Sequence, residues 1–185
     1  MKNFYIFFLI VISSCSSHNE SQEIQTTQRI DLGEIESDKI LEASGLASSR
    51  FNQNILWTHN DSGDSNRIFA MDINGNHVGE FLLNNTENRD WEDIAIGPGP
   101  MEGVDYIFVG DIGDNRSEND VKHIYRFVEP QVYTNNQSSE TNINNIESIS
   151  YQYEDGNRDA ETLIVDPITK DIIIISKREE SAVHV

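Results

Sequence analysis

Apolar residues along the chain come in short runs rich in Ile, Val, Phe and Tyr, and Asn, Asp and Gly separate these runs. Beyond residue 28, no stretch sustains the spacing of three and four residues that marks one face of an α-helix. Short apolar runs bounded by turn-forming residues are typical of β-strands. The pattern therefore predicts an all-β fold.

An acid-led motif recurs three times, starting at Glu42, Asp90 and Asp159. Each copy has an acidic residue, an apolar residue, a small or acidic residue, a polar residue or glycine, and then two apolar residues. A turn and a strongly apolar second strand follow each motif. The second strands are expected over Ile55–Thr58, Tyr106–Val109 and Ile172–Ile175, the third over Arg67–Met71, His123–Phe127 and Ala182–Val185, and a fourth over Val78–Leu83 and Ile149–Tyr153.

The repeated unit is a four-stranded antiparallel meander of roughly 45–70 residues, which is the length and strand count of a propeller blade. A single blade cannot bury both of its faces, so we expect the blades to stack around an axis. A sandwich or an open meander would explain the strands but not the recurring motif. Because the third copy stops within its third strand, we expect about three blades of a larger propeller and a fragment of a longer protein.

Three local features complete the expected fold. Asn74-Gly75 is the preferred two-residue turn of a β-hairpin and should connect the third and fourth strands of the first copy. The strand-like segment Arg29–Ile35 precedes the first copy and is expected to lack a partner. The Asn-rich stretch Thr134–Asn145 is low in apolar residues and predicts a surface excursion.

Four segments resemble a known group of proteins: WTHNDSG from Trp57, RDWEDIA from Arg89, VGDIGDN from Val109 and DAETLIVDP from Asp159. They are similar to bacterial secreted or lipoprotein β-propellers, mostly of undefined function, which are loosely similar to phytase-like and TolB-like six-bladed propellers. The resemblance covers about residues 40–185. It implies a propeller fold and a channel that accepts calcium, and it does not imply a particular reaction.

The N-terminus predicts an exported lipoprotein. One lysine precedes an unbroken apolar run, Phe4–Ile12, which is too short to cross a bilayer as a helix. Ile12-Ser13-Ser14-Cys15 resembles the bacterial lipobox, which implies cleavage after residue 14 and a lipid on Cys15. The alternative is a buried thiol behind an ordinary signal peptide. We therefore expect a signal peptide over 1–14, a lipidated cysteine and flexible tether over 15–28, and a folded domain over 29–185.

The net charge limits the classes of binding partner. Removing the first fourteen residues takes away Lys2 and no acidic residue, so the formal net charge falls from −19 to −20. A strongly acidic chain argues against binding to nucleic acid or to anionic headgroups. We expect attachment to the cell-envelope membrane through lipid on Cys15, with a small-molecule ligand or an envelope protein as further partner.

The candidate site follows from blade geometry. The first strand of a blade runs along the channel and the second runs back beside it, so the start of one and the end of the other share a mouth. Carboxylates gathered there repel one another unless a cation offsets them, and calcium is a suitable cation. The predicted calcium ligands are Asp61, Glu92, Asp111 and Glu161, and the predicted ligand-binding residues are Glu42, Asn60, Asp90, Asp159, Lys177 and Arg178. The alternative is that these acids cap strands.

Two functions fit these residues. The first is a lipid-anchored propeller without enzymatic activity that binds calcium and a ligand or protein partner at the channel mouth. The second is a calcium-dependent phosphoesterase of the phytase-like type, in which the same acids hold metal ions that activate water. Lys177-Arg178 is the only basic pair near the acids, which favours the binding function. No catalytic residue is predicted.

Overall fold

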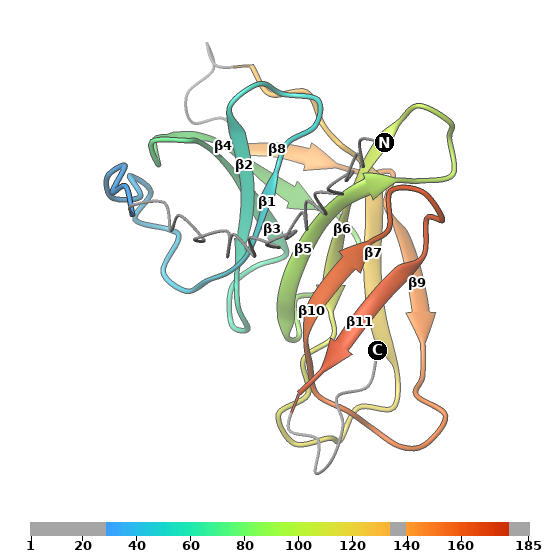
Figure 1. Cartoon of the computed structure of the whole chain (residues 1–185). Helices are drawn as coiled ribbons and strands as arrows, with labels where there is room; N and C mark the ends of the chain where they lie inside the picture. The colour runs from blue at the N-terminus through green and yellow to red at the C-terminus, as the bar shows by residue number, and fades with distance from the viewer. Residues whose placement is uncertain (1–28, 134–139, 178–185) are drawn as a thin grey trace, which may run out of the picture. The chain divides into compact units, whose positions relative to one another are not determined.

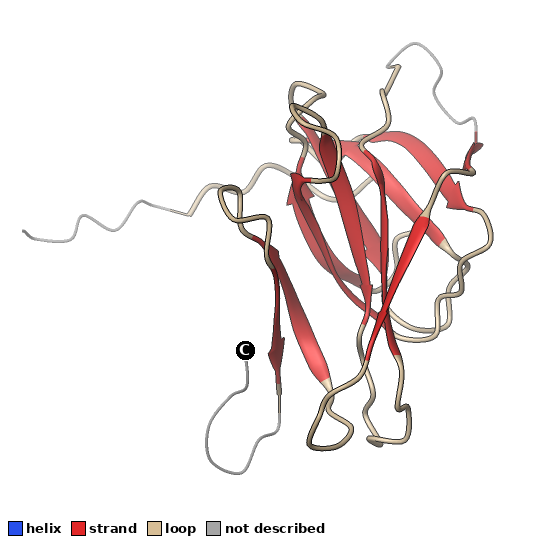
Figure 2. Ribbon diagram, turned by 90° about the vertical axis from the view of Figure 1, so that its right-hand side faces the viewer, coloured by secondary structure: helices blue, strands red, loops and turns tan. Residues whose placement is uncertain are grey.

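The computed structural model describes residues 29–133 and 140–177 of the chain. The chain divides into two units at Asp31, and the fold below is that of the unit that begins at Leu32. Every regular element in the described residues is a β-strand (Figure 2). None of these residues forms a helix long and apolar enough to cross a membrane. The all-β prediction is confirmed.

The first sheet begins as the predicted four-stranded antiparallel meander. Its strands are β1 (Ala43–Ser48), β2 (Ile55–Asn60), β3 (Arg67–Asp72) and β4 (His77–Leu83). A fifth strand, β8 (Glu140–Ile143), pairs with β4 in parallel. The central strands β2 and β3 are buried along most of their length.

The second sheet is another antiparallel arrangement of four strands. It consists of β5 (Trp91–Pro98), β6 (Asp105–Asp111), β7 (Lys122–Val128) and β9 (Glu147–Tyr151). The fourth strand therefore starts two residues earlier than predicted and ends two residues earlier. The chain leaves this sheet after β7, contributes β8 to the first sheet, and returns as β9.

The third copy supplies a two-stranded antiparallel sheet, β10 (Ala160–Val165) and β11 (Ile172–Ser176). The third strand that the sequence predicts for this copy, Ala182–Val185, lies outside the described residues. The first strands of the three copies are neighbours: β5 contacts β1 on one side and β10 on the other (Figure 1).

Two apolar clusters fill the space between the sheets. The larger joins the first and second sheets, and in it Trp57 meets Phe81 edge to face at a centroid distance of 5.0 Å. The smaller joins the second and third sheets and includes Phe108 and Leu163. Aromatic side chains of this size contribute most of the apolar area that such a core removes from water. Packing of the three sheets holds their strand ends in fixed positions.

Three local expectations need correction. The hairpin between β3 and β4 has a four-residue loop, closed by a hydrogen bond from Asp72 N to Asn76 O, and only Gly75 takes a positive φ, of 85°. The segment up to Ile35 is not a strand, because Gly33 adopts a φ of 126° that interrupts an extended run. The stretch Thr134–Asn145 is more than an excursion, since it contains β8.

Candidate functional site

A β-bulge occurs at the start of the first strand in all three copies. In β5 the register shifts between Trp91 and Asp93, and in β10 it shifts between Ala160 and Thr162. The extra residues are Glu92 and Glu161, which the sequence repeat had aligned. A bulged residue is left out of the strand ladder, and bulges commonly redirect a side chain. Glu92 and Glu161 therefore occupy bulge positions, whereas their neighbours in β5 and β10 pair within the sheet.

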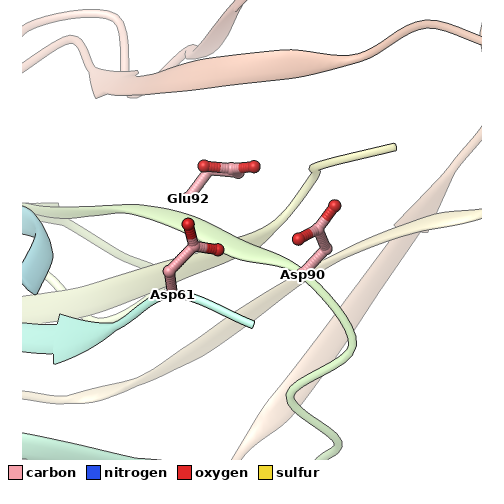
Figure 3. Close-up of side chains that lie close together, drawn as sticks. All are labelled: Asp61, Asp90 and Glu92. Atoms are coloured by element: carbon pink, nitrogen blue, oxygen red, sulfur yellow. The ribbon is translucent and has the colours of Figure 1, made fainter. Parts of the chain in front are cut away.

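The first acidic cluster consists of Asp61, Asp90 and Glu92, which we call the front cluster. Asp61 directly follows β2 and Asp90 directly precedes β5, so the two residues come from neighbouring sheets. One carboxylate oxygen of each residue lies within 4.8 Å of one oxygen of the other two. The three carboxylates converge on one space (Figure 3). This arrangement of oxygen donors is suited to a cation such as Ca²⁺.

Glu92 carries the strongest electrostatic signature of the front cluster. Its side chain is buried, with a relative exposure of 6%. Among the described residues, no hydrogen bond or ion pair reaches its carboxylate. Burial, reinforced by the negative charges of Asp61 and Asp90 and opposed by Lys177, raises the pKa of Glu92 to about 7. The negative charge of ionised Glu92 is therefore only partly balanced by the described side chains.

Gly113 makes room for the front cluster. A Cβ at this position would lie 2.4 Å from Glu92 Oε1 and 2.5 Å from Asp90 Oδ2. The Gly113 backbone N–H donates to Asp90 O, which closes the end of the second sheet. Burial also raises the pKa of Asp90, with the charges of Asp61 and Asp159 adding to it. Glycine at this position therefore lets two carboxylates lie against the backbone.

The second acidic cluster, which we call the rear cluster, consists of Glu92, Asp159 and Glu161, again with mutual oxygen distances within 4.8 Å. Lys177 pairs with two of its members, lying 3.4 Å from Asp159 Oδ2 and in close contact with Glu161 Oε1. Asp159 also accepts a hydrogen bond from Asp114 N at 2.8 Å. The rear cluster thus has its own basic partner, which the front cluster lacks among the described residues.

Asp111 does not join either cluster. Its Oδ1 accepts a hydrogen bond from Asp90 N at 2.8 Å, and its Oδ2 lies 3.8 Å from Arg89. Burial raises the pKa of Asp111, although the Asp90 N–H and the Arg89 guanidinium oppose this effect. The side chain therefore positions the start of β5 rather than offering oxygens to the front cluster.

Glu42 and Asn60 lie at the same end of the first sheet, beside the front cluster. Asn60 Oδ1 accepts hydrogen bonds from Leu41 N and Glu42 N, so it caps the strand start. Both residues line a cavity of about 620 Å³ that also contains Asp64 and Arg67. Arg178 and Cys15 lie outside the described residues.

Two acidic residues that were not predicted as site residues stabilise the structure around the clusters. Asp93 Oδ2 accepts from Leu163 N at 2.8 Å, which ties β5 to β10. Asp114 is buried with Lys122, whose Nζ lies 2.6 Å from its Oδ2. Burial opposes ionisation of Asp114, but hydrogen bonds from Lys122 and the Asn119 backbone outweigh it and lower the pKa to about 2. The paired acid in RDWEDIA signals Asp93, whereas no spacing in the sequence signals the Asp114–Lys122 pair.

The sequence aligns Lys177 with Asn60 and Asp111, and the structure shifts this equivalence by one residue. Strand pairing matches Ala160 with Ser176, as it matches Ala43 with Asn60. Just after each second strand, a backbone N–H donates to the backbone carbonyl of the first acid of the motif. The donors are Asp61, Gly113 and Lys177, and the acceptors are the carbonyl groups of Glu42, Asp90 and Asp159.

By this hydrogen bond, the equivalent positions at the three strand ends are an acid, a glycine and a lysine, and Gly113 lies two residues after the paired Asp111 where the other two lie one residue after their paired residue. At the front cluster, the arrangement offers only oxygen donors, which Ca²⁺ prefers, and it includes no sulfur or nitrogen ligand. Side chains from two sheets form it, and such a group does not easily impose the small, regular octahedron that Mg²⁺ requires. Comparison of the chain with protein-family models, with curated proteins and with solved structures finds no match.

Proposed function

We propose that the chain belongs to a lipid-anchored β-propeller of the bacterial cell envelope, and that it binds calcium and a further ligand or protein partner at the mouth of the channel. The propeller is supported by the way the sheets meet. β5 contacts β1 and β10, and apolar clusters fill the space between the sheets. Blades that surround a common axis contact one another in this way.

The calcium site rests on one observation, the Glu92 carboxylate. The Glu92 side chain is only 6% exposed and faces Asp61 and Asp90. Among the described residues, its carboxylate has no hydrogen bond or ion pair. A buried carboxylate whose charge is only partly balanced is costly, and a bound cation reduces that cost. Calcium suits the site because its coordination is flexible and its ligands are oxygens.

The cavity of about 620 Å³ beside the front cluster supports a second ligand. Its lining carries charges of both signs, with Glu42 and Asp64 against Lys39 and Arg67. A polar molecule, or a polar loop of an envelope protein, matches this lining. The anchor is proposed from the lipobox at Cys15 alone, since that residue lies outside the described part of the chain.

Direct calcium titration tests the proposed site. At a free calcium concentration 100 times Kd, binding to the folded state adds about 2.7 kcal/mol to the free energy of unfolding. For a domain of this size we expect the melting temperature to rise on the order of 5–10 °C. Magnesium should produce a smaller rise at the same concentration.

Asp61→Asn should reduce the calcium-dependent rise, because it removes one charged ligand from the front cluster. Asp171→Asn is the matched control, since Asp171 is an exposed acid that precedes β11 at the opposite end of that strand. Equal responses of wild type and Asp61→Asn, or no response of the wild type, would refute the site.

A second candidate function, calcium-dependent phosphoester hydrolysis, is favoured by one observation. A cavity of about 400 Å³ adjoins the front cluster and is lined by Asp90, Arg89 and Arg116. Guanidinium groups beside a metal are suited to a phosphate oxygen. Calcium-dependent release of p-nitrophenol from p-nitrophenyl phosphate, lost in Arg116→Ala, would support hydrolysis over binding.

A further inference from the structure

Lys177 lies in the rear cluster at the place that corresponds to the one proposed for Ca²⁺ in the front cluster. We propose that its ammonium group acts as an internal counter-ion that restricts the channel mouth to a single divalent cation. This inference rests on the calcium site proposed above and defines its stoichiometry.

The first step of the argument is the sharing of Glu92. The front and rear clusters are two groups of three carboxylates that have this one residue in common. An ion held by Asp61 and Asp90, and a charge held by Asp159 and Glu161, therefore act on the same buried carboxylate. Lys177 already supplies such a charge, since its Nζ pairs with Asp159 and Glu161.

The second step is the difference between equivalent strand ends. The backbone N–H groups of Asp61, Gly113 and Lys177 make the same closing hydrogen bond in the three copies. Asp61 adds a carboxylate between the first and second sheets. Gly113 adds none between the second and third, so the rear cluster lacks the ligand that corresponds to Asp61. Lys177 then adds a positive charge directly to that cluster.

The third step is the charge balance. Five carboxylates and one ammonium group leave four negative charges at the mouth when every acid is ionised. One Ca²⁺ halves this charge and a second would remove it, but the ammonium group of Lys177 lies between Asp159 and Glu161, where the second ion would bind. Asp159 is 4% exposed, and so it depends on a partner of this kind.

Calcium stoichiometry of the purified chain tests the proposal, measured by equilibrium dialysis with ⁴⁵Ca²⁺. We expect one Ca²⁺ per wild-type chain and two per Lys177→Met chain. Lys170→Met is the matched control, because Lys170 belongs to the same copy and its Nζ donates to Gly99 O rather than to an acid of either cluster. It should bind one Ca²⁺, as should Lys177→Arg, which keeps the charge.

One Ca²⁺ with unchanged Kd in Lys177→Met would overturn the proposal. No Ca²⁺ in the wild type but one in Lys177→Met would refute the calcium site of the front cluster and leave the role of Lys177 supported. If Lys177→Met does not fold without calcium, Lys177→Gln keeps an N–H donor without the charge and should also bind two ions. Failure of both variants to fold at millimolar calcium would overturn the proposal, because a cation would then not replace the lysine.

Discussion

Glu92→Gln separates a metal ligand from a structural cap, because the two roles predict opposite effects. Glutamine has nearly the same volume as glutamate but no charge, so it removes the repulsion from Asp61 and Asp90. The pKa of Glu92 is raised from 4.5 to about 7, chiefly by burial. This difference corresponds to at most about 3 kcal/mol, and water near the neighbouring acids screens part of it, leaving about 1–3 kcal/mol.

The direction of the pH dependence follows from the linkage between proton binding and folding. An acid whose pKa is higher in the folded state favours folding fully below its unfolded pKa, and this contribution is lost as the pH rises through about 7. Metal-free wild type should therefore lose stability between about pH 5 and pH 8. Glu92→Gln should lack this loss and exceed the metal-free wild type at pH 8 by about 1–3 kcal/mol, with little difference at pH 5.

Urea unfolding measures these free energies at both pH values, with EDTA or with excess calcium. Calcium should stabilise the wild type at pH 8 and should stabilise Glu92→Gln much less. Asp171→Asn serves as the control for removal of an exposed acid. A metal-free Glu92→Gln that is less stable than wild type at pH 8, and that keeps the full calcium response, would refute the reasoning.

Four further predictions test separate features. Calcium affinity should fall as the pH drops below about 7, because Glu92 takes up a proton; a pH-independent Kd in calorimetry would contradict this. Gly113→Ala should weaken calcium binding at least about 10-fold, since its Cβ displaces two carboxylates; an unchanged Kd would argue against the front cluster. Lys122→Met should lower the free energy of unfolding in urea by about 3–5 kcal/mol, because it leaves Asp114 buried without its counter-charge; a loss below about 1 kcal/mol would show that the pair is dispensable. Cys15→Ala should abolish incorporation of radiolabelled palmitate, and unchanged labelling would exclude that anchor.

The described strands of the three copies could be predicted because their apolar residues lie in short runs between turn-forming residues. The meeting of Asp90 and Glu92 with Asp61 followed from the shared end of the first and second strands. Asp111 shows the limit of this argument. It lies at the same strand end, but its side chain bonds to Asp90 N, and no residue spacing reveals that orientation.

Two other features could not be found from the sequence. Because of the bulges, Ser176 rather than Lys177 corresponds to Asn60. A bulge cannot be recognised in a pattern of hydrophobic residues. β8 is held by backbone hydrogen bonds along β4 and has mostly exposed side chains, so its residues carry no apolar signal.

The parallel pairing of β8 with β4 has a consequence for the order of folding. Glu80 pairs with Glu140, 60 positions later, so the outer edge of β4 stays uncovered until that distant segment arrives. At a synthesis rate of about 5–20 residues per second, β4 waits about 3–12 s for its partner to be made. An uncovered edge strand is a template for pairing with another chain. A shortened chain ending before Glu140 should therefore self-associate through β4, and the arrival of β8 protects the first sheet from aggregation.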